Sequence, residues 1–261
     1  MKGFRRAKAS AVCMAVFLVA IFTVACGGKV DPAAYELYNS AVNALEAGDG
    51  FALDSYSESS VVVNGGDPQD KTVNTLELEV SRAGGNTEMM ETVSVDQAGL
   101  KHELSMYYKD GFYYMNNDGD KIRYSAAGQG NMPSVDDIIS TEECQNIPVF
   151  PESAIRESSI EESNGLKNLS FTVKGEALPL SLNGGAAAGD PSVDGKTVYD
   201  DAVVTAIIEA NGNLSQTAFV YTVENKPNGN TTKTTTVNAC IITQNNVKVD
   251  FPDDLSAYNP L

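Results

Sequence analysis

The stretch YYKDGFYYMNNDGDKIRY, residues 107–124, holds two Asp-Gly pairs, each set between runs of aromatic and apolar residues. Asp-Gly flanked in this way is typical of a type I′ turn, which joins two antiparallel strands through two residues with positive φ angles. We therefore expect Asp110-Gly111 and Asp118-Gly119 to be the centres of two tight turns. The stretch predicts three consecutive antiparallel strands, and the turn positions fix which residues face each other.

Because side chains alternate between the faces of a strand, this pairing assigns each residue to a face. One face carries two cross-strand rows, whose members are candidate ligand-facing residues: Met106, Met115 and Ile122 in the first row, and Tyr108, Tyr113 and Tyr124 in the second. The other face is mixed, and we expect it to be solvated, with the Arg123 guanidinium able to stack on Tyr114. Cross-strand pairs stabilise a sheet by roughly 0.2–1 kcal/mol each, so the rows alone require no ligand. An apolar sheet face must nevertheless be covered by helices, another sheet or a ligand.

The rest of the chain shows strand patterns interrupted by two helical ones. Period-two alternation predicts strands at 51–63, 72–82, 87–95, 153–163 and 166–175, and three or four long strands between 202 and 252. Turns are expected at Asn164-Gly165, at Asn211-Gly212 and from Pro227 to Asn230, and a surface loop at 176–195. Helical spacing appears at 31–47, capped by Asp31, and at 134–145, capped by Ser134. No strand–helix–strand rhythm appears, so the pattern favours antiparallel pairing over a doubly wound α/β fold.

The N-terminus has the features of an export signal. Basic residues precede an apolar run from Ala11 to Ala25, which is shorter than the roughly twenty residues of a membrane-spanning helix. The run ends in TVAC, and Cys26 resembles the lipidated cysteine of bacterial lipoproteins, with Thr23 in place of the usual aliphatic residue. We expect residues 1–25 to be removed and Cys26 to carry lipid, such as palmitate, on the extracytoplasmic side of a bacterial cell membrane. A secretory signal cleaved elsewhere and an uncleaved anchor are the alternatives.

The charge of the chain excludes some partners. Removing residues 1–25 takes away four basic residues and no acid, which changes the net charge from −17 to −21. Such a surface repels nucleic acid and anionic lipid headgroups. We therefore expect no nucleic-acid partner, and membrane attachment only through the N-terminal lipid.

Residues that carry chemistry are few. His102 is the single histidine, and the chain has no Gly-x-Ser-x-Gly, Cys-x-x-Cys or His-x-x-x-His motif. The segment NNDGDK, residues 116–121, lacks the later ligands and the final Glu of a calcium loop. We expect no catalysis, no metal and no cofactor, while a hydrolase of cell-wall glycan stays open as a third class because its paired carboxylates need no motif.

An exported chain permits a disulfide between Cys144 and Cys240, and two buried free thiols are the alternative.

Residues 107–124 resemble the strand–turn–strand element of bacterial lipoproteins of the LolA/LprG-like lipoprotein-carrier group, especially Gram-positive members with a Tyr-x-Lys-Asp-Gly-Tyr-x-Tyr hairpin. The segment VKVDFPDDLSAY, residues 247–258, and the order of elements are similar as well. The resemblance implies an α+β, mostly β fold: a large curved antiparallel sheet, or half-barrel, wrapped around one or two helices. Its concave face holds acyl chains in some members. We expect residues 26–31 to be a lipidated cysteine with a flexible tether, and 32–261 a single half-barrel domain.

The expected function is therefore non-catalytic. We expect a membrane-anchored extracytoplasmic lipoprotein that binds a hydrophobic or lipid ligand on the concave face of its sheet. The alternative is a structural or protein-interaction module with an envelope protein partner and no small-molecule ligand.

Overall fold

The computed structural model describes residues 29–69, 71–128, 133–177, 198–226, 230–244 and 247–261. Two α-helices lie in these ranges, α2 (Pro32–Glu46) and α3 (Val135–Asn146). The strands are β1 (Gly50–Val63), β2 (Thr72–Ser81), β3 (Glu88–Gln97), β4 (Leu100–Lys109), β5 (Phe112–Asn117), β6 (Asp120–Ser125), β7 (Ile155–Ser163), β8 (Leu166–Val173), β9 (Val198–Tyr199), β10 (Ala202–Ile208), β11 (Leu214–Asn225), β12 (Thr232–Gln244) and β13 (Asn259–Pro260). The export signal with Cys26, nearly all of the expected 176–195 loop and most of the expected turn at 227–230 lie outside the described residues.

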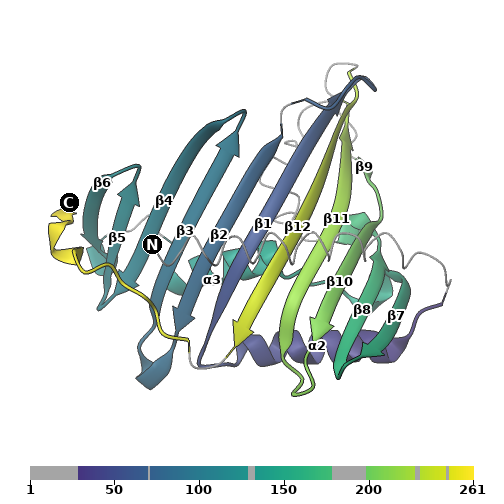
Figure 1. Cartoon of the computed structure of the whole chain (residues 1–261), viewed down its shortest axis with the longest axis horizontal. Helices are drawn as coiled ribbons and strands as arrows, with labels where there is room; N and C mark the ends of the chain where they lie inside the picture. Colours follow the sequence, from purple (N-terminus) through teal and green to yellow (C-terminus); the bar gives the residue numbers. More distant parts are fainter. Residues whose placement is uncertain (1–28, 70, 129–132, 178–197, 227–229, 245–246) are drawn as a thin grey trace.

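All strands of the described ranges join one open sheet, which Figure 1 shows face-on. Its order is β13-β6-β5-β4-β3-β2-β1-β12-β11-β10-β8-β7, with β9 paired to β11. Neighbouring strands run antiparallel, except that β13 is parallel to β6. The predicted preference for antiparallel pairing is confirmed.

The tight turns have the predicted geometry. The φ angles are 52° and 79° at Asp110-Gly111, 49° and 103° at Asp118-Gly119, and 55° and 76° at Asn164-Gly165. Two consecutive positive φ angles are the signature of type I′ turns. The register of β4, β5 and β6 is the predicted one, with Met115 opposite both Met106 and Ile122.

Both helices form where the sequence predicts them. The Asp31 carboxylate accepts from the Ala33 N–H (3.0 Å) and caps α2, while Ser134 and Asp137 form a capping box at the start of α3. Buried residues of α2 include Tyr38, whose ring lies 5.5 Å from that of Phe171 on β8. The helix lies against β7, β8, β10 and β11.

The hydrophobic core lies between the helices and one face of the sheet, which we call the inner face. Buried side chains from both helices and from the strands on either side of β1 belong to one continuous cluster. Figure 1 shows the C-terminal segment crossing β3 to β5 toward the β6 end. An open antiparallel sheet around two helices is the predicted α+β half-barrel, and this fold class is confirmed.

The described end of the expected tether, residues 29–31, lies against β7. The Ser158 N–H donates to the Lys29 carbonyl oxygen (3.1 Å), and the Asp31 N–H donates to Ser158 Oγ (2.7 Å). Because β7 is an edge strand, some of its backbone N–H groups point away from β8. The residues just before α2 lie close enough to accept a hydrogen bond from one of them, the Ser158 N–H.

Candidate functional site

The inner face of β2 to β6 carries three cross-strand rows, which we call the inner rows. The first is Val80, Met89, Tyr108, Tyr113 and Tyr124; the second is Leu78, Glu91, Met106, Met115 and Ile122; the third is Leu76, Val93 and Leu104. All six predicted ligand-facing residues belong to the first two rows. The structure therefore brings them together on one face, as the turn register implied.

The tyrosine row is part of the protein core. Tyr113 is 1% exposed, and its ring lies 4.9 Å from that of Tyr108 and 5.3 Å from that of Tyr124. Its hydroxyl donates to the Pro133 carbonyl oxygen (3.1 Å), just before α3. Burial raises the pKa of Tyr113 to about 12, so the hydroxyl stays neutral and keeps donating. Tyr113 is thus an anchor for the chain that leads into α3.

Other inner-row residues keep part of their surface accessible. Half-buried side chains in the second and third rows are Met115, Ile122, Val93 and Leu104. Met115 Sδ accepts from the Tyr124 hydroxyl (3.0 Å), which ties the second row to the first. These apolar groups lie on the inner face without being fully enclosed, so they are the surface that a hydrophobic molecule can contact.

The C-terminal end of α3 is fixed to the sheet by Asn146, which is buried. Its amide oxygen accepts from the Ser55 hydroxyl and from Asn238 Nδ2 (3.3 Å), and its carbonyl oxygen accepts from the Thr217 hydroxyl (2.9 Å). Asn146 Nδ2 in turn donates to the Glu142 carbonyl oxygen (2.8 Å). Since an unpaired buried amide costs free energy, this network determines where α3 ends on the inner face.

Glu91 interrupts the second inner row with a carboxyl group. It is 7% exposed, and its Oε2 atom has no hydrogen-bond partner in the described part of the chain. Burial, and secondarily the nearby Glu142 carboxylate of α3, raise the pKa of Glu91 to about 7. Burial also raises the pKa of Glu142. The two carboxyls lie between α3 and the sheet, where a neutral form is favoured.

A third acid extends this group. Burial raises the pKa of Glu143 to about 7, while the nearby Arg82 guanidinium acts in the opposite direction. Glu143 Oε1 and Arg82 Nη1 are both buried and unpaired within the described residues. This acidic group was not predicted from the sequence, although alternation with Met89 and Val93 places Glu91 on the apolar face.

The outer face of the same strands is covered by residues 247–261, which we call the C-terminal strap. The Phe251 ring lies 6.4 Å from that of Tyr107, and the buried Tyr258 ring packs edge-on against Tyr114 at 5.7 Å. Figure 1 shows the strap on the side of the sheet that faces the viewer. The expectation that this face is solvated is wrong where the strap crosses it.

The strap also changes the predicted partner of Arg123. The Arg123 guanidinium lies over the Phe112 ring, 5.3 Å from its centroid, and not over Tyr114, whose edge-on partner is Tyr258. Lys121 pairs with Asp254, and the Leu261 N–H donates to the Arg123 carbonyl oxygen (2.9 Å). The predicted stacking on Tyr114 is wrong because an aromatic residue from the strap lies against that ring.

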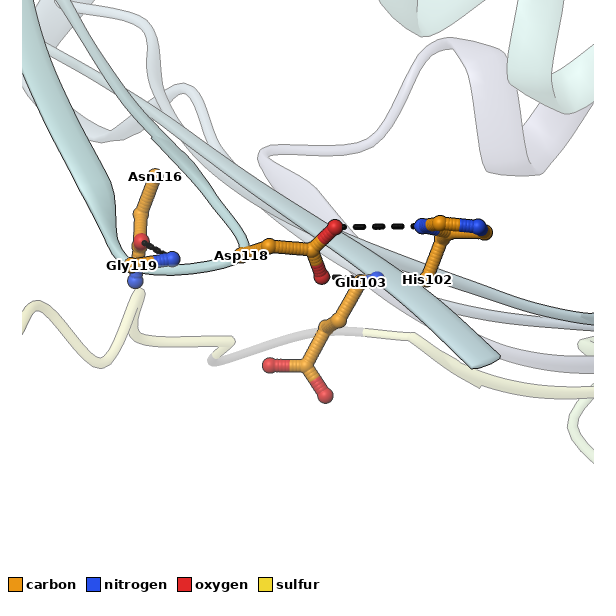
Figure 2. Close-up of polar contacts among 5 residues, drawn as sticks. All are labelled: His102, Glu103, Asn116, Asp118 and Gly119. Atoms are coloured by element: carbon orange, nitrogen blue, oxygen red, sulfur yellow. Dashed lines mark hydrogen bonds and ion pairs between the residues drawn. The ribbon is translucent and has the colours of Figure 1, made fainter. Parts of the chain in front are cut away.

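The polar side chains of the Asp118-Gly119 turn form hydrogen bonds with neighbouring residues, as Figure 2 shows. Asp118 Oδ1 accepts from the Glu103 N–H (3.0 Å), and Oδ2 lies 3.1 Å from His102 Nδ1. Asn116 Oδ1 accepts from the Gly119 N–H (3.0 Å). The hydrogen bond from the Glu103 N–H, and secondarily the one with His102, lower the pKa of Asp118. The oxygens of the NNDGDK segment thus stabilise the turn, and His102 is a surface residue.

The two cysteines of the described chain are free thiols. Cys144 on α3 is half-buried, and Cys240 on β12 is buried among apolar core residues. Burial raises the pKa of both thiols. The disulfide considered from the sequence is therefore not formed, and the alternative of free thiols describes the structure.

Neither a metal site nor a membrane-spanning helix is found in the described ranges. Their His, Cys, Asp and Glu side chains form no group of three or more that could hold a metal ion. The helices α2 and α3 are too short or too polar to cross a bilayer.

Comparison with known proteins gives only distant structural similarity. No protein-family model matches the sequence, and no curated protein matches it. LprF from Mycobacterium bovis is 12% identical over 87% of this chain and 99% of its own, with a TM-score of 0.36. A DUF1329 family protein from Desulfovibrio piger ATCC 29098 is 11% identical over 87% of this chain and 98% of its own, with a TM-score of 0.23. The fold assignment rests on the sheet and the two helices themselves.

Proposed function

We propose that this protein is a non-catalytic, membrane-anchored lipoprotein that binds a hydrophobic or lipid molecule on the inner face of its half-barrel. One observation carries the proposal: apolar inner-row side chains, among them Met115 and Ile122, remain half-buried although two helices lie on the same face. A half-buried apolar surface of this kind gains free energy when an acyl chain covers it, by about 25 cal/mol per Å² of buried surface.

The shape of the inner face supports a chain-like ligand. The second and third inner rows begin on β2 and together continue over the next four strands, β3 to β6. Neighbouring strands are about 4.8 Å apart. The exposed parts of Val93, Leu104, Met115 and Ile122 thus extend across the sheet rather than forming a single compact site. An extended apolar molecule fits such a surface better than a compact polar one.

The proposed location follows from the sequence of the N-terminus. Cys26 is the proposed site of lipid attachment, with residues 1–25 removed, and residues 32–261 are proposed to form one domain on the extracytoplasmic side. Durable anchoring needs two signals, such as two acyl chains, because a single acyl chain binds membranes only marginally.

Native mass spectrometry tests whether a ligand is bound. The chain without residues 1–28 is purified from cells in the absence of detergent, and its mass is measured before and after extraction with organic solvent. The expected result is an additional mass that extraction removes and that is recovered as a lipid. A ligand-free protein that also fails to take up added phospholipid or fatty acid would favour the alternative, an interaction module without a small-molecule ligand.

A further inference from the structure

The start of α2 is clamped to the edge of the sheet. The Ser158 N–H donates to the Lys29 carbonyl oxygen (3.1 Å). The Ser158 hydroxyl accepts from the Asp31 N–H (2.7 Å) and donates to the Asp31 carbonyl oxygen (3.1 Å). Because Asp31 is also the N-cap of α2, these three bonds join the first turn of the helix to β7. Ser158 and residues 29–31 form what we call the tether clamp.

The chain between the tether clamp and the proposed lipid site is short. Lys29 lies three residues after Cys26, and at roughly 3.5 Å per residue this length spans at most about 11 Å. The acyl chains of a lipidated cysteine are buried in the bilayer, so the cysteine itself lies at the interface. A clamped Lys29 therefore holds the nearby edge of β7 within about 11 Å of that interface.

The opposite edge of the sheet is far from the clamp. Ten inter-strand steps separate β7 from β6, which at about 4.8 Å per step gives roughly 48 Å along the sheet. Figure 1 shows the start of α2 beside β7 at one end of the molecule and β6 at the other. The two edges differ enough in position to be distinguished by their distance from a membrane.

We propose that the β7 edge and the N-terminal end of α2 are the part of this protein that lies against the membrane. The partner is the bilayer surface, and the β6 edge with the C-terminal strap is directed away from it. This inference rests on the proposed lipidation of Cys26. It goes beyond it because a lipidated cysteine on a free tether would impose no orientation.

Charge does not hold this edge at the membrane. The β7 strand carries Glu157, Glu161 and Glu162, which anionic headgroups repel. The covalent anchor and the tether clamp provide the proximity. Raising the salt concentration should therefore leave the proximity of β7 unchanged or increase it slightly.

Tryptophan fluorescence offers a direct test, because the chain contains no tryptophan. Full-length lipidated protein carrying Glu157→Trp on β7, or Asp120→Trp at the start of β6 as the matched control, is placed in phosphatidylcholine–phosphatidylglycerol vesicles. Some of the lipids carry a nitroxide quencher on the headgroup. We expect quenching at least threefold stronger for Glu157→Trp than for Asp120→Trp. Equal quenching in vesicle-bound protein would overturn the orientation.

A clamp variant separates the tether clamp from the anchor. Ser158→Pro removes both the N–H donor and the hydroxyl, and proline is tolerated where an edge-strand N–H points away from its neighbour. In the Glu157→Trp background, quenching should fall toward the control value while the protein still floats with the vesicles. Ser158→Ala, which removes only the two hydroxyl bonds, replaces it if Ser158→Pro does not fold. Unchanged quenching would exclude the clamp as the cause of the orientation, and protein that does not float would contradict the proposed anchor itself.

Discussion

Glu91 is the residue at which the inner face differs most from an ordinary apolar core. Its neighbours across the sheet are Leu78 and Met106, and its Oε2 atom has no hydrogen-bond partner in the described part of the chain. Deprotonation places a charge in this apolar row, opposite the Glu142 carboxylate. Since no ion pair with Glu91 is seen in the described residues, the charged form is opposed both by burial and by repulsion.

The raised pKa makes stability depend on pH in a defined direction. The folded protein holds the Glu91 proton up to about pH 7, whereas the unfolded chain releases it near the ordinary value of 4.5. Between these values the folded state binds more protons, so the free energy of unfolding falls as pH rises. At 1.36 kcal/mol per unit of pKa shift, the loss is on the order of 3 kcal/mol between pH 4 and pH 8.

Glu91→Gln tests this directly. The amide has nearly the same shape and cannot ionise, so we expect the variant to be more stable than the natural chain at pH 8 and similar to it at pH 4.5. Urea unfolding at a series of pH values measures the difference. Glu103→Gln, on the exposed outer side of β4, is the matched control and should leave the pH dependence as it is. A parallel shift of the curve at all pH values would contradict the assignment to Glu91.

At the scale of elements, the C-terminal strap supports the β5–β6 end of the sheet from outside. Tyr258 is 4% exposed and packs against Tyr114, and β13 adds two residues to the edge at β6. Without the strap, the outer face of these short strands would expose aromatic rings to solvent.

Tyr258→Ala should loosen this end of the sheet selectively. Truncation of a buried aromatic residue costs about 3–5 kcal/mol in well-packed sites, and we expect most of the loss in β5, β6 and β13. Hydrogen exchange followed by mass spectrometry should show faster exchange in β5 and β6 and unchanged exchange in β10 and β11. Leu261→Ala, at a side chain that is 79% exposed, serves as the control. Uniformly faster exchange would mean that the strap stabilises the whole sheet.

Local signals in the sequence account for the elements that were predicted well. Asp-Gly and Asn-Gly pairs fix type I′ turns through φ angles that few residues adopt, and the caps Asp31 and Ser134 mark helix starts through nearby donors. The strap and the tether clamp depend on contacts between residues more than a hundred positions apart, such as Tyr258 with Tyr114 and Asp31 with Ser158. No periodic pattern encodes such contacts. The expectation of a solvated outer face was therefore wrong under the strap, and the tether clamp was not predicted.

The candidate site likewise has a part that the sequence predicts and a part that only the packing of the fold determines. The register of β4 to β6 followed from the turns, so the six inner-face residues were found by alternation. Whether a residue is enclosed depends on what packs over it. Tyr113 is buried and hydrogen-bonded to Pro133, just before α3, whereas Met115 is half-buried. Glu91 was overlooked because one acid in a strand pattern usually marks the solvent side, although alternation with Met89 and Val93 placed it on the apolar face. The sheet register puts it opposite Leu78 and Met106.

At the scale of the whole molecule, the lipid on Cys26 should determine where the protein is found. Cys26→Ser removes the acceptor for lipid, so we expect the protein to move from the membrane fraction to the soluble fraction after export. Fractionation with detergent phase separation measures the change. Cys240→Ser, in the core, tests whether loss of a cysteine as such alters the distribution, and it should not. Membrane retention of Cys26→Ser would indicate an uncleaved signal as the anchor.

The most direct test of ligand binding on the inner face uses tryptophans on opposite sides of β4. Leu104→Trp places the fluorophore among the inner rows, and Glu103→Trp places it on the outer face one residue away. The two variants are titrated with fatty acids that carry bromine along the acyl chain, which quench a tryptophan only at close range. We expect saturable quenching for Leu104→Trp and little quenching for Glu103→Trp. Equal quenching of both, or none up to the solubility limit of the fatty acid, would contradict ligand binding on the inner face.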